Sequence, residues 1–143
     1  MKKMKFVLCV AAIYGFGIGS ICAQTISYKL TSPGTESGWD CNPANGNECI
    51  VFTASKATYD TTKKVFSFSF SGPGNQQVVF PSFVNHVSQL TKTGKNGVTT
   101  TMTATYSPVT RMIDLGIVSN GQDKRKNPRY LLQGAQFSPK EPA

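Results

Sequence analysis

The segment from Trp39 to Cys49 contains the residues whose chemistry is easiest to anticipate. Its two cysteines, Cys41 and Cys49, would close a nine-residue ring if they were bonded to each other. A pair of cysteines this close in sequence predicts a disulfide if the protein folds in an oxidising compartment. A ring of this size should stabilise the fold by about 2.5 kcal/mol, because it restricts the unfolded chain. We therefore expect a Cys41–Cys49 disulfide that fixes a polar loop.

The same loop gathers the side-chain oxygens that calcium prefers. These donors are Asp40, Asn42, Asn45, Asn47 and Glu48. Their spacing departs from a calcium-binding loop, because Gly46 falls one place late and Ala44 occupies a ligand position. We expect a disulfide-stapled structural turn with no cofactor, and keep calcium as the alternative.

Trp39 is the only tryptophan of the chain. An exposed indole could stack on the face of a sugar, with hydrogen bonds from polar neighbours. The structural alternative is that Trp39 packs at the rim of the core, as lone tryptophans commonly do. The candidate ligand contacts in this loop are Trp39, Asp40, Asn42 and Asn47.

A second candidate surface is the basic run that ends at Arg129. Four positive charges fall within six residues, at Lys124, Arg125, Lys126 and Arg129. Such a cluster could bind an acidic glycan, an anionic lipid or a protein of the cell envelope. The alternative is a charged hairpin tip that keeps the protein soluble.

The chain has few groups suited to catalysis. His86 is the only histidine, so a serine hydrolase would need it together with an activated serine and an acid. The candidate acids are Asp40, Asp60, Asp114 and Asp123. No Gly-x-Ser-x-Gly elbow, nucleotide-binding loop or zinc motif is present. We expect no enzyme activity and a half-buried His86 in a strand, with a small hydrolase using His86 as the alternative.

The first 23 residues have the layout of a secretory signal peptide. Three lysines precede sixteen uncharged residues from Phe6 to Ile21, and the small Ala23 comes before the polar chain. The apolar run is shorter than the roughly 20 residues that span a bilayer. We expect cleavage after Ala23 and a secreted or periplasmic protein. The alternatives are an uncleaved anchor and lipid attachment at Cys22.

Cleavage changes the charge of the chain. The mature protein has twelve basic and seven acidic residues, a net charge of +5. This mild excess is a solubility feature rather than a signature of nucleic-acid binding. Cys41 and Cys49 are the cysteines that remain.

Apolar and polar residues alternate along much of the mature chain, which predicts β-strands. Within Val65–Ser71, three phenylalanines share one face and three serines share the other. The segments Thr25–Leu30, Val98–Tyr106 and Arg111–Ser119 show the same pattern, and four threonines line the wet side of Val98–Tyr106. Residues 49–54 should be buried on both faces. Pro81 should divide the run 77–90 into two strands or bend it at a sheet edge, and Gly134 should form a bulge within 129–137.

Turn-forming residues separate these segments, as in Gly72-Pro73-Gly74 and Asn120-Gly121. About seven to nine short strands joined in this way predict an all-β fold, a single antiparallel β-sandwich or a small barrel. Ser107-Pro108 should close a tight hairpin. We expect one domain over residues 24–137 and a frayed tail over 138–143.

These features predict an exported β-domain with a non-catalytic role in binding or envelope assembly. Its partner would be a glycan, an anionic lipid or an envelope protein, with no nucleic acid involved. No transmembrane span should remain after cleavage. A further hypothesis is a structural subunit that adds a strand to a partner's sheet.

Overall fold

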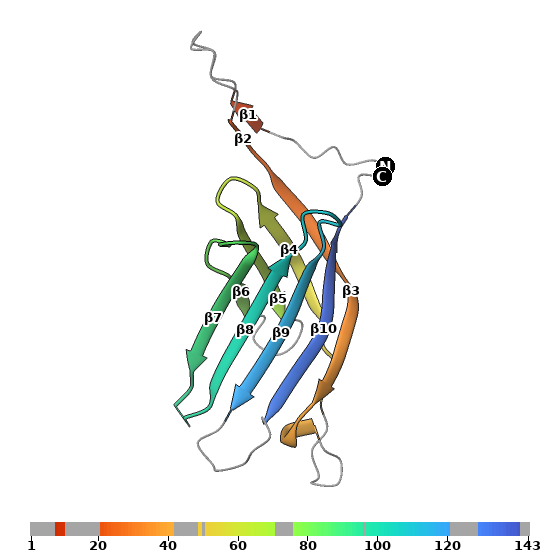
Figure 1. Cartoon of the computed structure of the whole chain (residues 1–143), viewed down its shortest axis with the longest axis vertical. Helices are drawn as coiled ribbons and strands as arrows, with labels where there is room; N and C mark the ends of the chain where they lie inside the picture. The colour runs from red at the N-terminus through yellow and green to blue at the C-terminus, as the bar shows by residue number, and fades with distance from the viewer. Residues whose placement is uncertain are drawn as a thin grey trace.

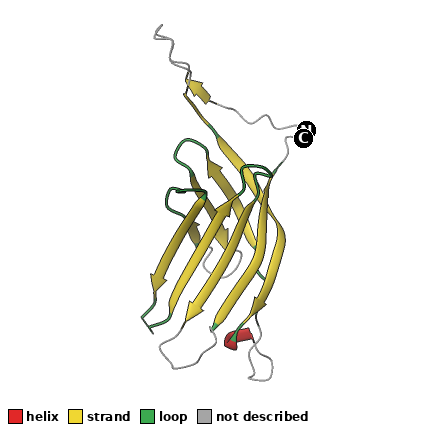
Figure 2. Ribbon diagram, in the orientation of Figure 1, coloured by secondary structure: helices red, strands yellow, loops and turns green. Residues whose placement is uncertain are grey.

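A computed structural model describes residues 8–10, 21–41, 49, 51–70, 76–95, 97–120 and 129–140. In these ranges the chain is all-β, apart from a short 3-10 turn (Figures 1 and 2). The elements are β1 (Leu8–Val10), β2 (Ile21–Ala23), β3 (Thr25–Ser37), η1 (Trp39–Cys41), β4 (Ala54–Asp60), β5 (Val65–Phe70), β6 (Gln77–Val79), β7 (Val87–Thr93), β8 (Thr99–Tyr106), β9 (Ile113–Asn120) and β10 (Tyr130–Pro139). Within the same ranges, no helix has the length and apolar character needed to cross a bilayer.

The predicted leader contains β1 and β2, which pair with each other as short antiparallel strands. The rest of the leader, residues 1–7 and 11–20, lies outside the described residues. Cleavage after Ala23 therefore stays a prediction.

The other eight strands form one antiparallel sheet in the order β6-β5-β4-β3-β10-β9-β8-β7. The sheet curls into a half-barrel, so that its two halves face each other (Figure 1). The predicted all-β antiparallel fold is confirmed. The two separate sheets of a sandwich are not seen in the described part of the chain, because β3 and β10 pair at the centre and join both halves.

Two glycines allow the central strands to bend. The register of β10 against β9 shifts around Gly134, which has φ +78, so the predicted bulge is confirmed. Gly34 of β3 has φ +74, and a Cβ at this position would lie 2.5 Å from the backbone oxygen of Gln133. Glycine is required there both for its backbone conformation and for the close approach of β10.

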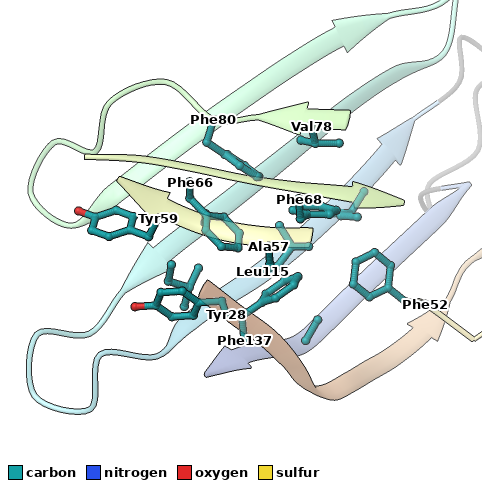
Figure 3. Close-up of a cluster of buried hydrophobic side chains, with 14 of the residues drawn as sticks. Tyr28, Phe52, Ala57, Tyr59, Phe66, Phe68, Val78, Phe80, Leu115 and Phe137 are labelled. Carbon is teal, nitrogen blue, oxygen red and sulfur yellow. The ribbon is translucent and has the colours of Figure 1, made fainter. Parts of the chain in front are cut away.

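Aromatic side chains fill the space inside the half-barrel (Figure 3). Phe66 and Phe68 of β5 are fully buried, which confirms the alternation predicted for this segment. The ring of Phe137, on β10, lies 5.1 Å from the ring of Phe66 and joins the two halves of the sheet. The other largest fully buried side chains are Phe80, Ile113, Leu115 and Leu132.

The remaining strand predictions have mixed outcomes. Pro81 separates β6 from β7, and β8 and β9 form the expected hairpin. Burial of residues 49–54 on both faces is wrong, because Val51 is 61% exposed while Phe52 is buried. The last strand runs two residues past position 137, since Pro139 pairs with Tyr28 of β3.

Neighbouring strands run in opposite directions, so the loops gather at two ends. The upper end, as drawn in Figure 1, contains the start of β3 and the loops 61–64, 80–86 and 107–112. The lower end contains η1, Cys49, the turn between β7 and β8, and Arg129. These two names are used below.

Tyr28 connects β3 to the turn between β8 and β9 from inside the core. Its side chain is buried, and its hydroxyl donates a hydrogen bond to the backbone oxygen of Arg111 at 2.7 Å. Burial raises the pKa of Tyr28 above its ordinary value, and the neighbouring Tyr106 raises it further. The folded protein therefore keeps this phenol protonated at pH values where the unfolded chain ionises, from about pH 10.

We expect Tyr28 to make the protein sensitive to alkaline pH. Because its folded pKa is raised, its contribution to stability is complete below the unfolded pKa and is lost as the pH rises. The free energy of unfolding should fall by about 1.4 kcal/mol per pH unit on account of this group. Urea titrations between about pH 9 and pH 11 measure the slope. Tyr28→Phe should show a shallower fall, and equal slopes for the two proteins would contradict the assignment.

Candidate functional site

The lower end is built around the turn that follows β3. Gly38 has φ +110, and a Cβ there would lie 2.7 Å from the backbone oxygen of Arg129, so glycine is required. The backbone N–H of Cys41 then donates to the oxygen of Gly38 at 3.1 Å and closes η1. This turn carries Trp39, Asp40 and Cys41 to the start of β10.

A contact between Asp40 and Arg129 joins the two candidate ligand-binding segments, which are the loop from Trp39 to Cys49 and the basic run that ends at Arg129. The backbone N–H of Asp40 donates to the backbone oxygen of Arg129 at 2.7 Å. The guanidinium Nη2 of Arg129 lies 3.2 Å from Oδ1 of Asp40, with 33% and 39% of the two side chains exposed. Both residues were expected to contact a ligand, which stays a prediction. Each is the partner of the other, so this pair serves to dock the loop onto β10.

The predicted disulfide is confirmed. Cys41 and Cys49 are bonded, with their Cα atoms 4.8 Å apart. The sulfur of Cys49 lies 3.6 Å from the backbone oxygen of Asp40, directly beside the docking pair. The bond therefore fixes both ends of the loop at the position where it meets β10.

A shallow depression of about 360 Å³ lies between the disulfide and β3. Its lining residues are Gly34, Thr35, Glu36, Cys41, Cys49, Val51 and Phe52. Val51 is a large apolar side chain at its rim, and it stays mostly exposed. The depression therefore combines a carboxylate, a hydroxyl and an apolar rim on a rigid frame.

Glu36 is held in place by Tyr130. The hydroxyl of Tyr130 donates to Oε2 of Glu36 at 2.6 Å. Burial raises the pKa of Tyr130, and the hydrogen bond to Glu36 raises it further. This pair was not predicted, because Ser32-Pro33-Gly34 is a typical turn sequence. The alternation of Ile26, Tyr28 and Leu30, continued to position 36, places Glu36 on the same face of β3.

Several predicted contacts cannot be placed at this site. Trp39 is half-buried at the lower end. Five of the candidates lie outside the described residues, namely Asn42, Asn47, Lys124, Arg125 and Lys126. Asp40 is the one described member of the predicted calcium donors, since Asn45 and Glu48 also lie outside. No cluster of three or more metal-ligating side chains is found within the described ranges.

His86 lies at the upper end, far along the barrel from this site (Figure 1). Asn85 and His86 form a two-residue hairpin turn between Val84 and Val87, with φ +52 and +68. The expected half-buried strand position is therefore wrong, and the side chain is exposed. Its imidazole lies 6.2 Å from the ring of Tyr106 and has no hydrogen bond or ion pair within the described part of the chain.

Comparison of the chain with known protein families, with curated proteins and with solved structures finds no match. Any function must therefore be inferred from the residues at the two ends of the half-barrel.

Proposed function

We propose that this protein is an exported, non-catalytic binding domain whose contact surface is its lower end, and that its ligand is a glycan carrying acidic groups. The observation that carries the proposal is the docking of Asp40 onto Arg129, since it joins the tryptophan-containing loop to the basic run. The indole of Trp39 for the sugar face and the cation of Arg129 for an acidic substituent therefore lie at one end, and Lys124, Arg125 and Lys126 are proposed to add to this positive charge.

The frame of this surface is rigid. The disulfide, the Asp40–Arg129 pair and the Tyr130–Glu36 hydrogen bond all lie within the same small region. A preorganised surface loses little conformational entropy when a ligand binds, which favours affinity. This rigidity supports a binding role for the lower end.

Titration with polysaccharides tests the proposal, with the emission of Trp39 as the signal. A sulfated polysaccharide such as heparin should change the emission, whereas neutral dextran should not. Replacing Lys124, Arg125 and Lys126 by alanine should weaken heparin binding by about tenfold or more. Replacing Lys29, Lys63 and Lys140 together by alanine is the matched control, because it removes three exposed cations outside the lower end. Equal affinity of all variants would contradict the proposal.

Strand addition remains a second candidate function, because β7 is an open edge of the sheet. The backbone N–H of Tyr106 donates to the oxygen of His86, and the backbone N–H of Gly94 donates to the oxygen of Val98. The even-numbered residues of β7 therefore direct their backbone N–H and C=O groups toward β8. It follows that the backbone groups of Gln89, Thr91 and Thr93 point away from β8. These groups are available to a partner strand. Sedimentation of the titration samples separates the two candidates, since strand addition between copies would appear as a concentration-dependent increase in mass.

A further inference from the structure

The upper end carries more cations than acids. Lys63 and Lys64 lie in the loop between β4 and β5, Arg111 lies in the turn between β8 and β9, and Lys140 follows β10. All four side chains are exposed, and none forms an ion pair within the described part of the chain. Two acids among the described residues lie at this end: Asp114, which is exposed at the start of β9, and Asp60. The Oδ1 of Asp60 already accepts hydrogen bonds from the backbone N–H groups of Thr62 and Lys63.

Two valines project from the same end. Val109, in the turn between β8 and β9, is 91% exposed. Val84, which precedes the turn at Asn85 and His86, is 69% exposed. Apolar tips surrounded by cations are the combination that binds the surface of an anionic membrane.

The loops that carry these side chains are fixed to one another. The backbone N–H of Phe83 donates to the oxygen of Lys64 at 3.0 Å, which joins two of the loops. Tyr59 lies behind them, with its ring 5.8 Å from Phe83 and stacked 5.4 Å from Tyr106. Together with the bond from Tyr28 to Arg111, these contacts make the upper end a preformed surface.

Two of the cations occupy backbone positions that favour glycine. Lys64 and Arg111 have φ +56 and +63, and each closes its turn by donating to the residue four positions earlier, Asp60 and Ser107. A long side chain in the left-handed region is strained, whereas glycine is not. The chain thus has cations at two equivalent turn positions where glycine would be easier to accommodate.

The chain also enters the sheet at this end. The backbone N–H of Thr61 donates to the oxygen of Gln24 at 2.9 Å, so the residue before β3 lies against the Lys63 loop. An uncleaved anchor upstream of β3 would therefore hold the upper end close to a bilayer.

We propose that the upper end is a membrane-docking surface that lies on anionic lipid headgroups. Lys63, Lys64, Arg111 and Lys140 contact the phosphates, and Val109 and Val84 reach the apolar boundary. The lower end then points away from the membrane, toward its own ligand. This inference does not depend on the proposed glycan binding, because it rests on the opposite end of the molecule.

Sedimentation with vesicles tests the proposal, using the chain from Gln24 onward, which holds all eight strands of the sheet and the whole buried core. Vesicles that mix phosphatidylcholine with phosphatidylglycerol should bind the protein in about 0.1 M salt, where charges are screened beyond about 10 Å. Vesicles of phosphatidylcholine alone should not bind it. Lys64→Gly and Arg111→Gly should each lower the partition coefficient about fivefold, and together about thirtyfold. Both substitutions keep the backbone conformation of the turn.

Lys56→Gly is the matched control. Lys56 has φ +52, so the change removes the same charge from the same backbone conformation. It lies in β4 four residues before Asp60, about 13 Å from the upper turn and beyond the reach of screened charges. Its partition coefficient should stay within about twofold of the parent.

The native tryptophan reports the orientation. Trp39 is at the lower end, so brominated lipids should leave its emission unchanged, whereas the indole of a Val109→Trp variant should be quenched. The proposal is overturned if anionic vesicles fail to bind the protein, if the three glycine variants bind equally, or if Trp39 is the tryptophan that is quenched.

Discussion

Replacing Phe66 by alanine should lower the free energy of unfolding by about 4 kcal/mol. The side chain is fully buried, and its ring lies 5.1 Å from Phe137, 5.9 Å from Tyr28 and 6.1 Å from Phe80. These neighbours belong to opposite halves of the curled sheet. Removing the ring leaves a cavity at the contact between the halves, which the surrounding strands cannot close because their backbones are hydrogen-bonded.

Urea unfolding, followed by the intrinsic fluorescence, measures the loss. Phe66→Leu keeps most of the volume and should cost less than about 1.5 kcal/mol, so it remains measurable if the alanine variant does not fold. Val79→Ala is the control, because Val79 lies on an edge strand and is half exposed; its effect should stay within about 0.5 kcal/mol. If Phe66→Ala and Phe66→Leu lowered the free energy of unfolding as little as Val79→Ala does, the arrangement of the core would be contradicted.

Removing the disulfide should have the second largest effect. Replacing Cys41 and Cys49 together by serine should lower the free energy of unfolding by about 2.5 kcal/mol, because the unfolded chain regains the freedom of a nine-residue ring. The bond also holds the wall of the depression and lies beside the Asp40–Arg129 pair. We therefore expect weaker heparin binding in the same variant.

Thermal unfolding with and without a reducing agent measures the stability effect. The reductant should destabilise the parent and leave the double serine variant unchanged. Asp40→Ala separates the two roles of the loop, since it removes the contact to Arg129 and keeps the disulfide. A parent protein that is insensitive to reductant would show that the bond does not stabilise the fold.

The parts of the fold that depend on local pattern could be predicted from the sequence. The alternation around Phe66 and Phe68, the break at Pro81 and the bulge at Gly134 each follow from the side-chain or backbone preferences of a few neighbouring residues. The disulfide was predictable for the same reason, since it joins two cysteines in one loop.

The parts that depend on distant segments could not be predicted in this way. Asp40 and Arg129 are 89 residues apart, and nothing in either segment indicates the other. Closure into one sheet depends on the pairing of β3 with β10, which no local pattern encodes. The strand position expected for His86 was wrong because Asn-His is an uncommon hairpin turn. Lys64 and Arg111 have left-handed backbone conformations, which the sequence would have indicated only if glycine stood at these positions.

The central pairing of β3 with β10 has a consequence for the order of assembly. These are the first and the last strands of the sheet in the sequence, and every other strand of that sheet is added outward from them. The seam between them cannot form until the carboxyl-terminal strand has been synthesised, and closing so long a loop is slow. A chain that lacks its final strand therefore keeps the two halves of the sheet unjoined, and the aromatic core between them stays incomplete.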